Sequence, residues 1–337
     1  MNPAELIEKV VSGIDLDSRE MERMMGALTK SDMPAAQIGF FLGALRAKKE
    51  GIGELTGAAQ ALRRHAAFID AGPRPVIDTC GTGGDHADTF NISTTAAFVA
   101  AGAGVAVAKH GNRSISSKCG SADVLVACGF NLDVDPVVME YAIQKIGIGF
   151  LFAPKMHPAL GKIAGVRRDI GARTIFNMAA PLANPAGASG QVLGVFASNL
   201  VEMYARVLLA LGTRRAFVVH GMDGLDEISC CAPTRVCQLN DGQIKTFELI
   251  PEMLIGERYD PSQIKGGLPR ENAAILRGIL DGSIGGAKRA IVLMNAAAAI
   301  AAGGAADSLE IGMELATRSL ESGAALQKFE QLIEASK

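Results

Sequence analysis

Three glycines within four positions follow a short apolar segment of this 337-residue sequence. The chain reads Asp78-Thr-Cys-Gly81-Thr-Gly83-Gly84-Asp85 directly after Val76 and Ile77. Glycines in such a turn let successive backbone N–H groups converge on one point, so the turn can hold a phosphate or pyrophosphate without a lysine. Asp85 could accept a hydrogen bond from a sugar hydroxyl. The segment is neither a Walker A loop nor a G-x-G-x-x-G fingerprint, and its alternative role is a tight turn between a strand and a helix.

A cluster of polar residues follows, immediately before the apolar segment Ala96–Ala101 that we expect to be helical. It consists of Thr89, Asn91, Ser93 and Thr94. One such residue is enough to cap a helix, and capping is the usual role of these residue types. Because four are present and a helix N-terminus attracts anions, the sequence indicates a second set of phosphate contacts near the glycine turn.

A basic loop lies between two apolar segments, Val105–Ala108 and Ala122–Ala127. It runs Lys109-His110-Gly111-Asn112-Arg113-Ser114-Ile115-Ser116-Ser117-Lys118-Cys119-Gly120-Ser121. Open α/β sheets bind ligands at the carboxyl ends of their strands, where this loop is expected to lie. A solvated loop of no specific function is the alternative.

Two adjacent carboxylates, Asp226 and Glu227, follow the apolar segment Ala216–Val219 in a glycine-containing loop. Such a pair suits Mg²⁺, which takes one or two carboxylates and completes its shell with water and phosphate oxygens. Acidic pairs are also common on protein surfaces without a metal. Their expected place at another strand end favours the magnesium site.

His157 and Arg167 lie ten residues apart, which is nearly three helical turns, so the two side chains could share one helical face. A single histidine or arginine usually has a structural role. We therefore assign these two residues no function from spacing alone.

The elements that must position these residues change character near residue 71. Residues 1–70 read as helices only, with a capping box at Asp17-Ser-Arg-Glu20. After that point short apolar strands alternate with helices, which predicts an α/β fold with a mainly parallel central sheet flanked by helices. The expected strands include 76–79, 105–108, 148–152 and 216–219, followed by an antiparallel hairpin over 234–249 and helices over 270–337.

The composition excludes several classes of protein. With 33 basic and 35 acidic residues the formal charge is -2, so a protein that mainly binds the nucleic-acid backbone is disfavoured. The longest apolar stretches, 96–108 and 291–306, fall short of the ~20 residues that span a bilayer, and no signal peptide is evident. The six cysteines form no C-x-x-C pair and are expected to be reduced thiols. We expect a cytoplasmic protein that binds neither membrane nor nucleic acid.

Taken together and in this order, the motifs resemble the anthranilate phosphoribosyltransferases, the tryptophan-pathway members of the nucleoside phosphorylase/phosphoribosyltransferase family. The motifs are Gly-Thr-Gly-Gly-Asp, Asn-Ile-Ser-Thr, Lys-His-Gly-Asn-Arg-Ser, Phe-Ala-Pro with His-Pro-Ala, Arg-Thr-Ile-Phe-Asn, and Asp-Glu. The resemblance implies a smaller all-helical domain, residues 1–70 joined by helices from about 160–195, packed on an α/β domain of residues 71–337. It also implies an active site between the domains and a homodimer formed through the helical domains.

The resemblance further implies Mg²⁺, with two ions when phosphoribosyl pyrophosphate (PRPP) is bound, and no acid or base catalyst, with positioning by Lys109 and Arg167. The metal would be held by Ser93, Asp226 and Glu227. Anthranilate would contact Gly81, His110, Asn112, His157, Arg167 and Pro181. PRPP would contact Gly81, Gly84, Asp85, Thr89, Asn91, Ile92, Ser93, Thr94, Lys109, His110, Gly111, Asn112, Arg113, Ser114, Ile115, Ser116, Ser117 and Ser121.

Two positions depart from the family pattern. Ala180 stands where a glycine is usual, beside the expected anthranilate pocket, and Cys119 replaces a serine of nearly the same size. A transferase for another aromatic amine is therefore one alternative function. A pyrimidine nucleoside phosphorylase-like enzyme and a non-enzymatic nucleic-acid-binding relative are the others.

Overall fold

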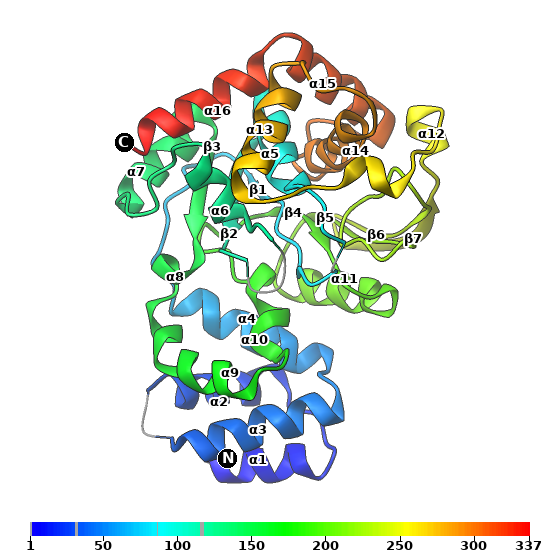
Figure 1. Cartoon of the computed structure of the whole chain (residues 1–337). Helices are drawn as coiled ribbons and strands as arrows, with labels where there is room; N and C mark the ends of the chain where they lie inside the picture. The colour runs from blue at the N-terminus through cyan, green and yellow to red at the C-terminus, as the bar shows by residue number, and fades with distance from the viewer. Residues whose placement is uncertain (1, 31–32, 86, 115–117) are drawn as a thin grey trace.

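The computed structural model describes residues 2–30, 33–85, 87–114 and 118–337, and all structural statements below concern these ranges. Their strands form one seven-stranded sheet of order β3-β2-β1-β4-β5-β6-β7 (Figure 1). The five strands β1 to β5 pair in parallel, whereas β6 and β7 pair antiparallel at one edge. The bounds are β1 Val76–Asp78, β2 Ala106–Gly111, β3 Ile148–Phe152, β4 Gly190–Gly194, β5 Arg215–Gly221, β6 Thr234–Asn240 and β7 Gln243–Leu249.

The predicted α/β class with a mainly parallel sheet is confirmed. The predicted antiparallel hairpin over 234–249 is confirmed as well, as strands β6 and β7. Asp241 and Gly242 both have positive φ, of 44° and 90°, as a two-residue hairpin turn requires. Strand β4 was not expected from the sequence, because glycines at both of its ends weaken the apolar pattern.

Helices cover both faces of the sheet. Adjacent strand residues enter different cores, since Phe217 packs in one hydrophobic cluster and Val218 in the other. The first core includes helices α5, α14 and α16, and the second includes α11 and the N-terminal helices. The helices of this part are α5 Ile92–Gly102, α6 Ser121–Ala127, α7 Pro136–Tyr141, α11 Val201–Ala210, α12 Glu252–Ile255, α13 Pro269–Leu280, α14 Gly286–Ala302, α15 Leu309–Glu321 and α16 Ala324–Ala335.

The N-terminal helices gather at one end of the molecule, as the sequence predicts. They are α1 Pro3–Val11, α2 Ser18–Lys30, α3 Ala35–Lys48 and α4 Ile52–Arg64. The capping box before α2 is present, because the Asp17 carboxylate accepts from the Glu20 N–H at 2.8 Å and the Asp17 N–H donates to the Glu20 carboxylate at 2.9 Å. Gly57 allows α4 to cross α2 closely, since a Cβ there would lie 2.2 Å from the Ser18 carbonyl oxygen.

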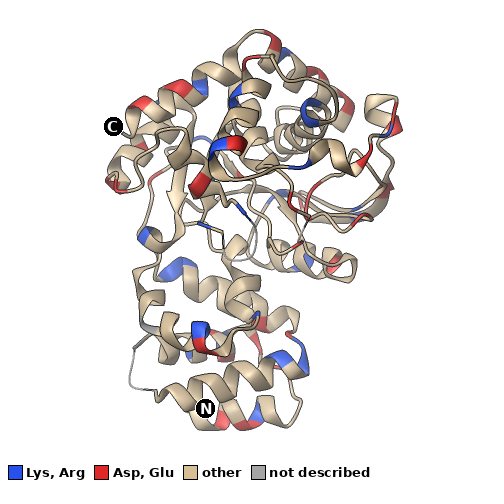
Figure 2. Ribbon diagram, viewed as in Figure 1, with Lys and Arg blue, Asp and Glu red and all other residues tan. Residues whose placement is uncertain are grey.

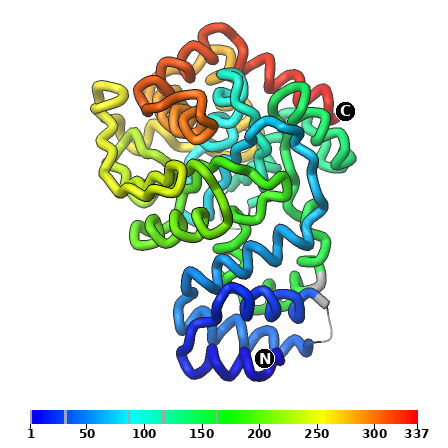
Figure 3. The backbone as a smooth tube through the Cα atoms, turned by 180° about the vertical axis from the view of Figure 1, so that it is seen from behind, coloured from blue at the N-terminus to red at the C-terminus, as the bar shows by residue number. Residues whose placement is uncertain are grey.

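Short helices from the middle of the chain lie beside this N-terminal group (Figure 3). The segment contains α8 Ala153–Met156, the 3₁₀ helix Pro158–Ile163, α9 Ala164–Ile170, α10 Ile175–Ala179 and the 3₁₀ helix Ala180–Leu182. Helix α10 contacts α3 and α4. The expectation that His157 and Arg167 share one helical face is wrong, because α8 ends before His157, Pro158 opens a 3₁₀ turn, and Arg167 belongs to the separate helix α9.

Basic and acidic residues are both scattered over the molecule in the view of Figure 2, in keeping with the formal charge of -2. This distribution gives no support to the nucleic-acid-binding alternative. Among the described residues, no helix is both long and apolar enough to cross a membrane.

Candidate active site

The glycine turn lies at the carboxyl end of β1 and is tied to the end of β4. The Thr82 N–H donates to the Gly194 carbonyl at 2.9 Å, and the Thr82 hydroxyl accepts from the Phe196 N–H at 3.1 Å. Gly83 and Gly84 have φ of 65° and 78°, a conformation that disfavours any side chain. These constraints fix the backbone of a glycine turn of the kind that can hold an anion.

The two carboxylates expected from the sequence reach this turn from the loop after β5. The Asp226 carboxylate accepts from the Gly83 N–H at 2.7 Å, and the Glu227 carboxylate accepts from the Ser93 N–H at 3.1 Å. Gly194 must lack a side chain, because a Cβ there would lie 1.5 Å from the Asp226 carbonyl oxygen. The structure thus brings together the glycine turn, the start of α5 and the acidic pair.

The electrostatics of the acidic pair suit a cation. Burial raises the pKa of Asp226, and the neighbouring Asp85 raises it further; burial and the adjacent Asp226 likewise raise the pKa of Glu227. Lys109 is the nearby cation that opposes the shift of Glu227. Carboxylate and hydroxyl oxygens are the hard ligands that Mg²⁺ prefers, so the residues present fit this ion.

At the start of α5, the Asn91 side chain contacts other segments instead of capping the helix. Asn91 makes no side-chain cap bond; its amide donates to the Cys119 carbonyl at 3.1 Å and accepts from the Asn272 amide at 3.1 Å. Ile92 and Thr94 are buried, and Thr89 forms an isolated antiparallel bridge with Lys265.

The basic loop leaves the end of β2 and folds against the start of α6. The buried Lys109 ammonium donates to the carbonyl and hydroxyl oxygens of Thr79, at 3.0 and 3.1 Å. Asp123 pairs with Arg113 at 3.0 Å and accepts from the Ser114 N–H, while the Asn112 N–H donates to the Ser121 hydroxyl. Gly111 ends the strand, and Ile115, Ser116 and Ser117 lie outside the described residues.

Two buried histidines lie where the end of β2 meets the segment after α8. His110 follows Lys109 on β2 and His157 follows α8, and their ring centroids are 5.1 Å apart. Among the described residues, neither Nε2 has a hydrogen-bond partner. Burial and the neighbouring His157 lower the pKa of His110 to about 3, and burial lowers the pKa of His157. Both imidazoles are therefore neutral near pH 7.

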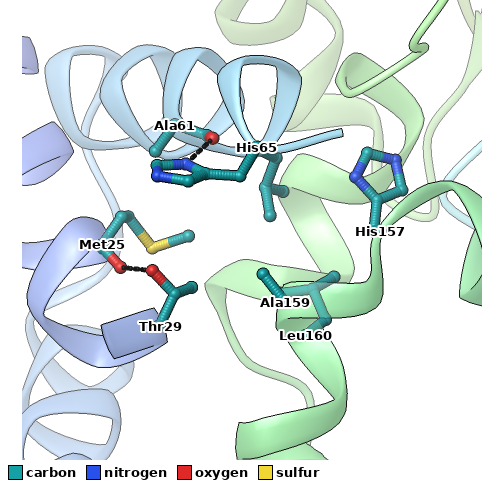
Figure 4. A pocket seen from close by; sticks show the side chains of 8 residues that line it. Met25, Thr29, Ala61, His65, His157, Ala159 and Leu160 are labelled. Atoms are coloured by element: carbon teal, nitrogen blue, oxygen red, sulfur yellow. Dashed lines mark hydrogen bonds between the residues drawn. The ribbon is translucent and has the colours of Figure 1, made fainter. Parts of the chain in front are cut away.

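A small pocket lies on the helical side of His157, where α2, α4 and the 3₁₀ helix after α8 meet (Figure 4). Its polar members among the described residues are Thr29, His65 and His157, and the Thr29 hydroxyl and the His65 ring are each hydrogen bonded to their own helix. The other lining residues are apolar, so the pocket is poorly suited to a phosphate. The lining comprises Met25, Thr29, Ala61, Leu62, His65, His157, Ala159 and Leu160.

Arg167 and Pro181 come from the short helices beside the N-terminal group. The Arg167 guanidinium carbon lies 5.3 Å from the centroid of the Phe176 ring, and burial lowers the pKa of this arginine. The carbonyl of Pro181 accepts from the Gln191 amide at 2.7 Å, which ties this segment to β4. The side chains therefore come from different elements, and no single helix carries them.

Two residues that support this region, Asn184 and Asn295, are not among the site residues expected from the sequence. The amide of Asn184 donates to the buried Asp78 carboxylate at 2.7 Å, and Asp78 also accepts from the His110 N–H. The side-chain amide of Asn295 in α14 accepts from the Ile228 N–H and donates to the Ile228 carbonyl, both at 2.9 Å. Ile228 directly follows the acidic pair. Asn295 is a polar residue within an apolar alanine-rich segment, and that contrast is the one clue that could have identified it.

A second group of metal-ligand types, Asp78, Cys80 and His110, brings its ligand atoms within 4.8 Å of one another. It does not suit a metal ion, because both Asp78 oxygens already accept hydrogen bonds. Burial, chiefly, and the nearby Asp78 raise the pKa of the Cys80 thiol, so the thiolate that would bind a metal is disfavoured.

Comparison with known proteins agrees with this geometry. Residues 4–66 match the helical bundle domain of a glycosyl transferase family, and residues 73–326 match the a/b domain of a glycosyl transferase family. The anthranilate phosphoribosyltransferase of Desulfosudis oleivorans is 54% identical over 99% of this chain and 98% of its own length.

Solved structures are similar as well. The anthranilate phosphoribosyltransferase of Thermus thermophilus has a TM-score of 0.93 and 39% identity, covering 98% of this chain and 99% of the other. The enzyme of Saccharomyces cerevisiae in complex with PRPP and Mg has a TM-score of 0.90 and 29% identity, covering 99% and 97%. The chain belongs to the anthranilate phosphoribosyltransferase family.

Proposed function

We propose that this pentosyltransferase moves the 5-phosphoribosyl group of PRPP to the amine of anthranilate, giving N-(5-phosphoribosyl)anthranilate and pyrophosphate. The observation that carries the proposal is the junction of the glycine turn, Ser93 and the acidic pair at the carboxyl ends of β1 and β5. This junction combines anion-binding N–H groups with cation-binding carboxylates, which a metal-bound pyrophosphate requires.

The donor site consists of the glycine turn, the start of α5 and the basic loop after β2. The turn and the start of α5 offer backbone N–H groups to phosphate oxygens. Asn91, whose amide is engaged by Cys119 and Asn272, keeps these segments in register. The donor residues are Gly81, Gly84, Asp85, Thr89, Asn91, Ile92, Ser93, Thr94, Lys109, His110, Gly111, Asn112, Arg113, Ser114 and Ser121, with Ile115, Ser116 and Ser117 from the sequence.

Ser93, Asp226 and Glu227 would hold Mg²⁺, and two ions are expected when the donor is bound. The ion, when bound, neutralises charge that develops on the departing pyrophosphate. The raised pKa values of the two carboxylates support this assignment: burial raises them most and the neighbouring acidic groups raise them further, and a bound cation would offset both effects. The yeast relative crystallised with PRPP and Mg gives the same pairing of ligand and ion in a homologous protein.

The acceptor site consists of Gly81, His110, Asn112, His157, Arg167 and Pro181. Arg167 binds the anthranilate carboxylate, a task suited to the planar guanidinium fork. The two buried histidines stay neutral and so present polar ring edges without adding a charge beside the amine.

The chemistry needs positioning more than acid or base catalysis. An aromatic amine is neutral near pH 7 and is already a nucleophile, whereas cleavage of the bond from ribose C1 to pyrophosphate separates charge. Lys109 and the N–H groups of the glycine turn stabilise the negative charge on the leaving group. Loss of one such preorganised donor costs roughly 10²–10³ in rate in comparable sites.

The domain division, assembly and location remain predictions from the sequence. Contact of α10 with α3 and α4 supports a helical domain of residues 1–70 joined by about 160–195, set against an α/β domain of residues 71–337. Exposed apolar side chains on the N-terminal helices and in the connection between α1 and α2 support a homodimer through this domain. They are Val11, Ile14, Phe40 and Ile52, between 41% and 58% exposed. A cytoplasmic location is likewise proposed.

Loss of anthranilate fluorescence tests the function directly. Purified protein should consume anthranilate only when both PRPP and Mg²⁺ are present, with pyrophosphate formed in equal amount. Phosphorolysis of thymidine instead would identify a nucleoside phosphorylase. Faster turnover of another aromatic amine would show that anthranilate is not the preferred acceptor.

A further inference from the structure

Arg173 lies in the short connection between α9 and α10 and has no role in the assignments above. Its guanidinium carbon is 3.8 Å from the centroid of the Phe196 ring, which follows β4. One of its terminal nitrogens, Nη2, donates to the Gly84 carbonyl at 3.4 Å. A residue from the helical side of the molecule therefore touches two segments at the carboxyl edge of the sheet.

The guanidinium also packs directly on the backbone of the glycine turn. A Cβ built on Gly84 would lie 1.9 Å from Arg173 Nη2, so any side chain at this position would displace the guanidinium, and the φ of 78° independently favours glycine. The Phe196 N–H donates to the Thr82 hydroxyl of the same turn at 3.1 Å. The two stacked residues thus hold the glycine turn at two points, Thr82 and Gly84.

The charge of Arg173 fits this place. Asp226, the carboxylate that accepts from Gly83, also interacts electrostatically with Arg173. The second terminal nitrogen, Nη1, is buried and has no partner among the described residues. A partly buried cation placed against the backbone of a turn that would hold an anion points to a role in organising that turn.

We propose that Arg173, stacked on Phe196, is a positioning residue that holds the glycine turn in the conformation that binds the phosphoribosyl donor. This inference rests on the proposed function, because it takes PRPP as the ligand of the turn. Arg173 acts through Gly84 and Thr82, so its loss should weaken donor binding far more than acceptor binding. A lysine keeps the charge but loses the planar stack and the fork, so it should not replace the arginine fully.

The test compares Arg173→Ala, Arg173→Lys and Phe196→Leu with the unaltered protein. Steady-state kinetics give the KM of each substrate, and calorimetry gives the Kd of PRPP with Mg²⁺ in the absence of anthranilate. Arg173→Ala should raise the donor KM and Kd roughly tenfold, the factor expected from loss of a partly buried cation–π contact. The acceptor KM should change by less than about twofold. Arg173→Lys should retain part of the affinity.

Arg168→Ala is the matched control, because Arg168 is an exposed arginine a few residues earlier and should leave both KM values unchanged. Arg173→Ala combined with Phe196→Leu should weaken donor binding little more than either change alone, since both break the same contact. Thermal unfolding midpoints separate loss of folding from loss of positioning. If Arg173→Ala does not fold, the donor Kd and the two KM values are compared for Arg173→Lys and Phe196→Leu instead.

Unchanged donor Kd in the folded variants, or an equal rise in both KM values, would overturn the proposal. Fully additive effects of Arg173 and Phe196 would also contradict it. Failure of the proposed function has a different signature, because the unaltered protein would then show no turnover. The calorimetric comparison of donor affinity would still report on Arg173 in that case.

Discussion

The imidazole rings of His110 and His157 meet edge to face, with centroids 5.1 Å apart, where the end of β2 meets the junction after α8. Both side chains are buried, at 3% and 5% exposure. The backbone of Ala180 partly opposes the lowered pKa of His110, and the backbone of Leu62 and Ala183 partly opposes that of His157. The pair therefore joins the sheet to the short helices as two neutral rings.

This pair makes the stability of the protein sensitive to acid. Burial lowers the pKa of His110 from 6.5 to about 3, so below pH 6.5 the unfolded chain binds a proton that the folded chain does not. Stability should consequently fall as pH drops from 6.5 toward 3, by at most about 1.4 kcal/mol per pH unit for this one group.

The variant His110→Gln removes that dependence. Its unfolding midpoint should fall less than that of the unaltered protein when the pH is lowered from about 7.5 to about 5. His65→Gln is the control, since His65 is exposed and should leave the pH dependence unchanged. Identical pH profiles for His110→Gln and the unaltered protein would refute the assignment of a neutral, buried His110.

The acidic pair should determine the magnesium requirement. Asp226→Asn combined with Glu227→Gln keeps the size of both side chains but removes their charge, so turnover should fall roughly 10²-fold or more. The measurement is the rate as a function of Mg²⁺ concentration, with Asp307→Asn, an exposed acidic residue, as the control. If the double variant and the unaltered protein show equal turnover at the same Mg²⁺ concentration, the metal assignment is ruled out.

Arg167 should discriminate between the two substrates. Arg167→Ala removes the proposed partner of the anthranilate carboxylate and should raise the acceptor KM roughly tenfold or more. The donor KM should change much less, which initial rates with each substrate varied in turn will measure. A larger effect on the donor than on the acceptor would reverse the proposed orientation of the substrates.

Asn295 should stabilise both the fold and the acidic loop. Asn295→Leu leaves the buried N–H and carbonyl of Ile228 without partners, which should lower the free energy of unfolding by about 1–3 kcal/mol. Urea unfolding measures this loss, with the neighbouring buried substitution Met294→Leu as a volume-conserving control. Equal midpoints for the two variants would contradict the role given to Asn295.

Much of the fold was predictable because its signals are local. The capping box at Asp17 and Glu20, the hairpin turn at Asp241 and Gly242, and the apolar strands each depend on residues close in sequence. Strand β4 was missed because its flanking glycines resemble a loop. The possibility that His157 and Arg167 share one helical face was wrong, because Pro158 starts a 3₁₀ helix between them.

The part of the site that lies at the carboxyl ends of strands could be predicted from the sequence. The glycine turn, Ser93 and the acidic pair each follow or flank a strand, and parallel strands place their carboxyl ends at one edge. The stack of Arg173 on Phe196 was not predictable, because the two residues belong to different elements and nothing in either residue type specifies the partner. Buried polar partners such as Asn184 depend on tertiary packing in the same way.

The most direct test of the central claim is a crystal structure of this protein soaked with PRPP and Mg²⁺. Pyrophosphate oxygens should lie on the N–H groups of the glycine turn, and Mg²⁺ should be held by the carboxylates of Asp226 and Glu227. Donor density at any other place on the protein, or a metal ion bound away from these two carboxylates, would contradict it.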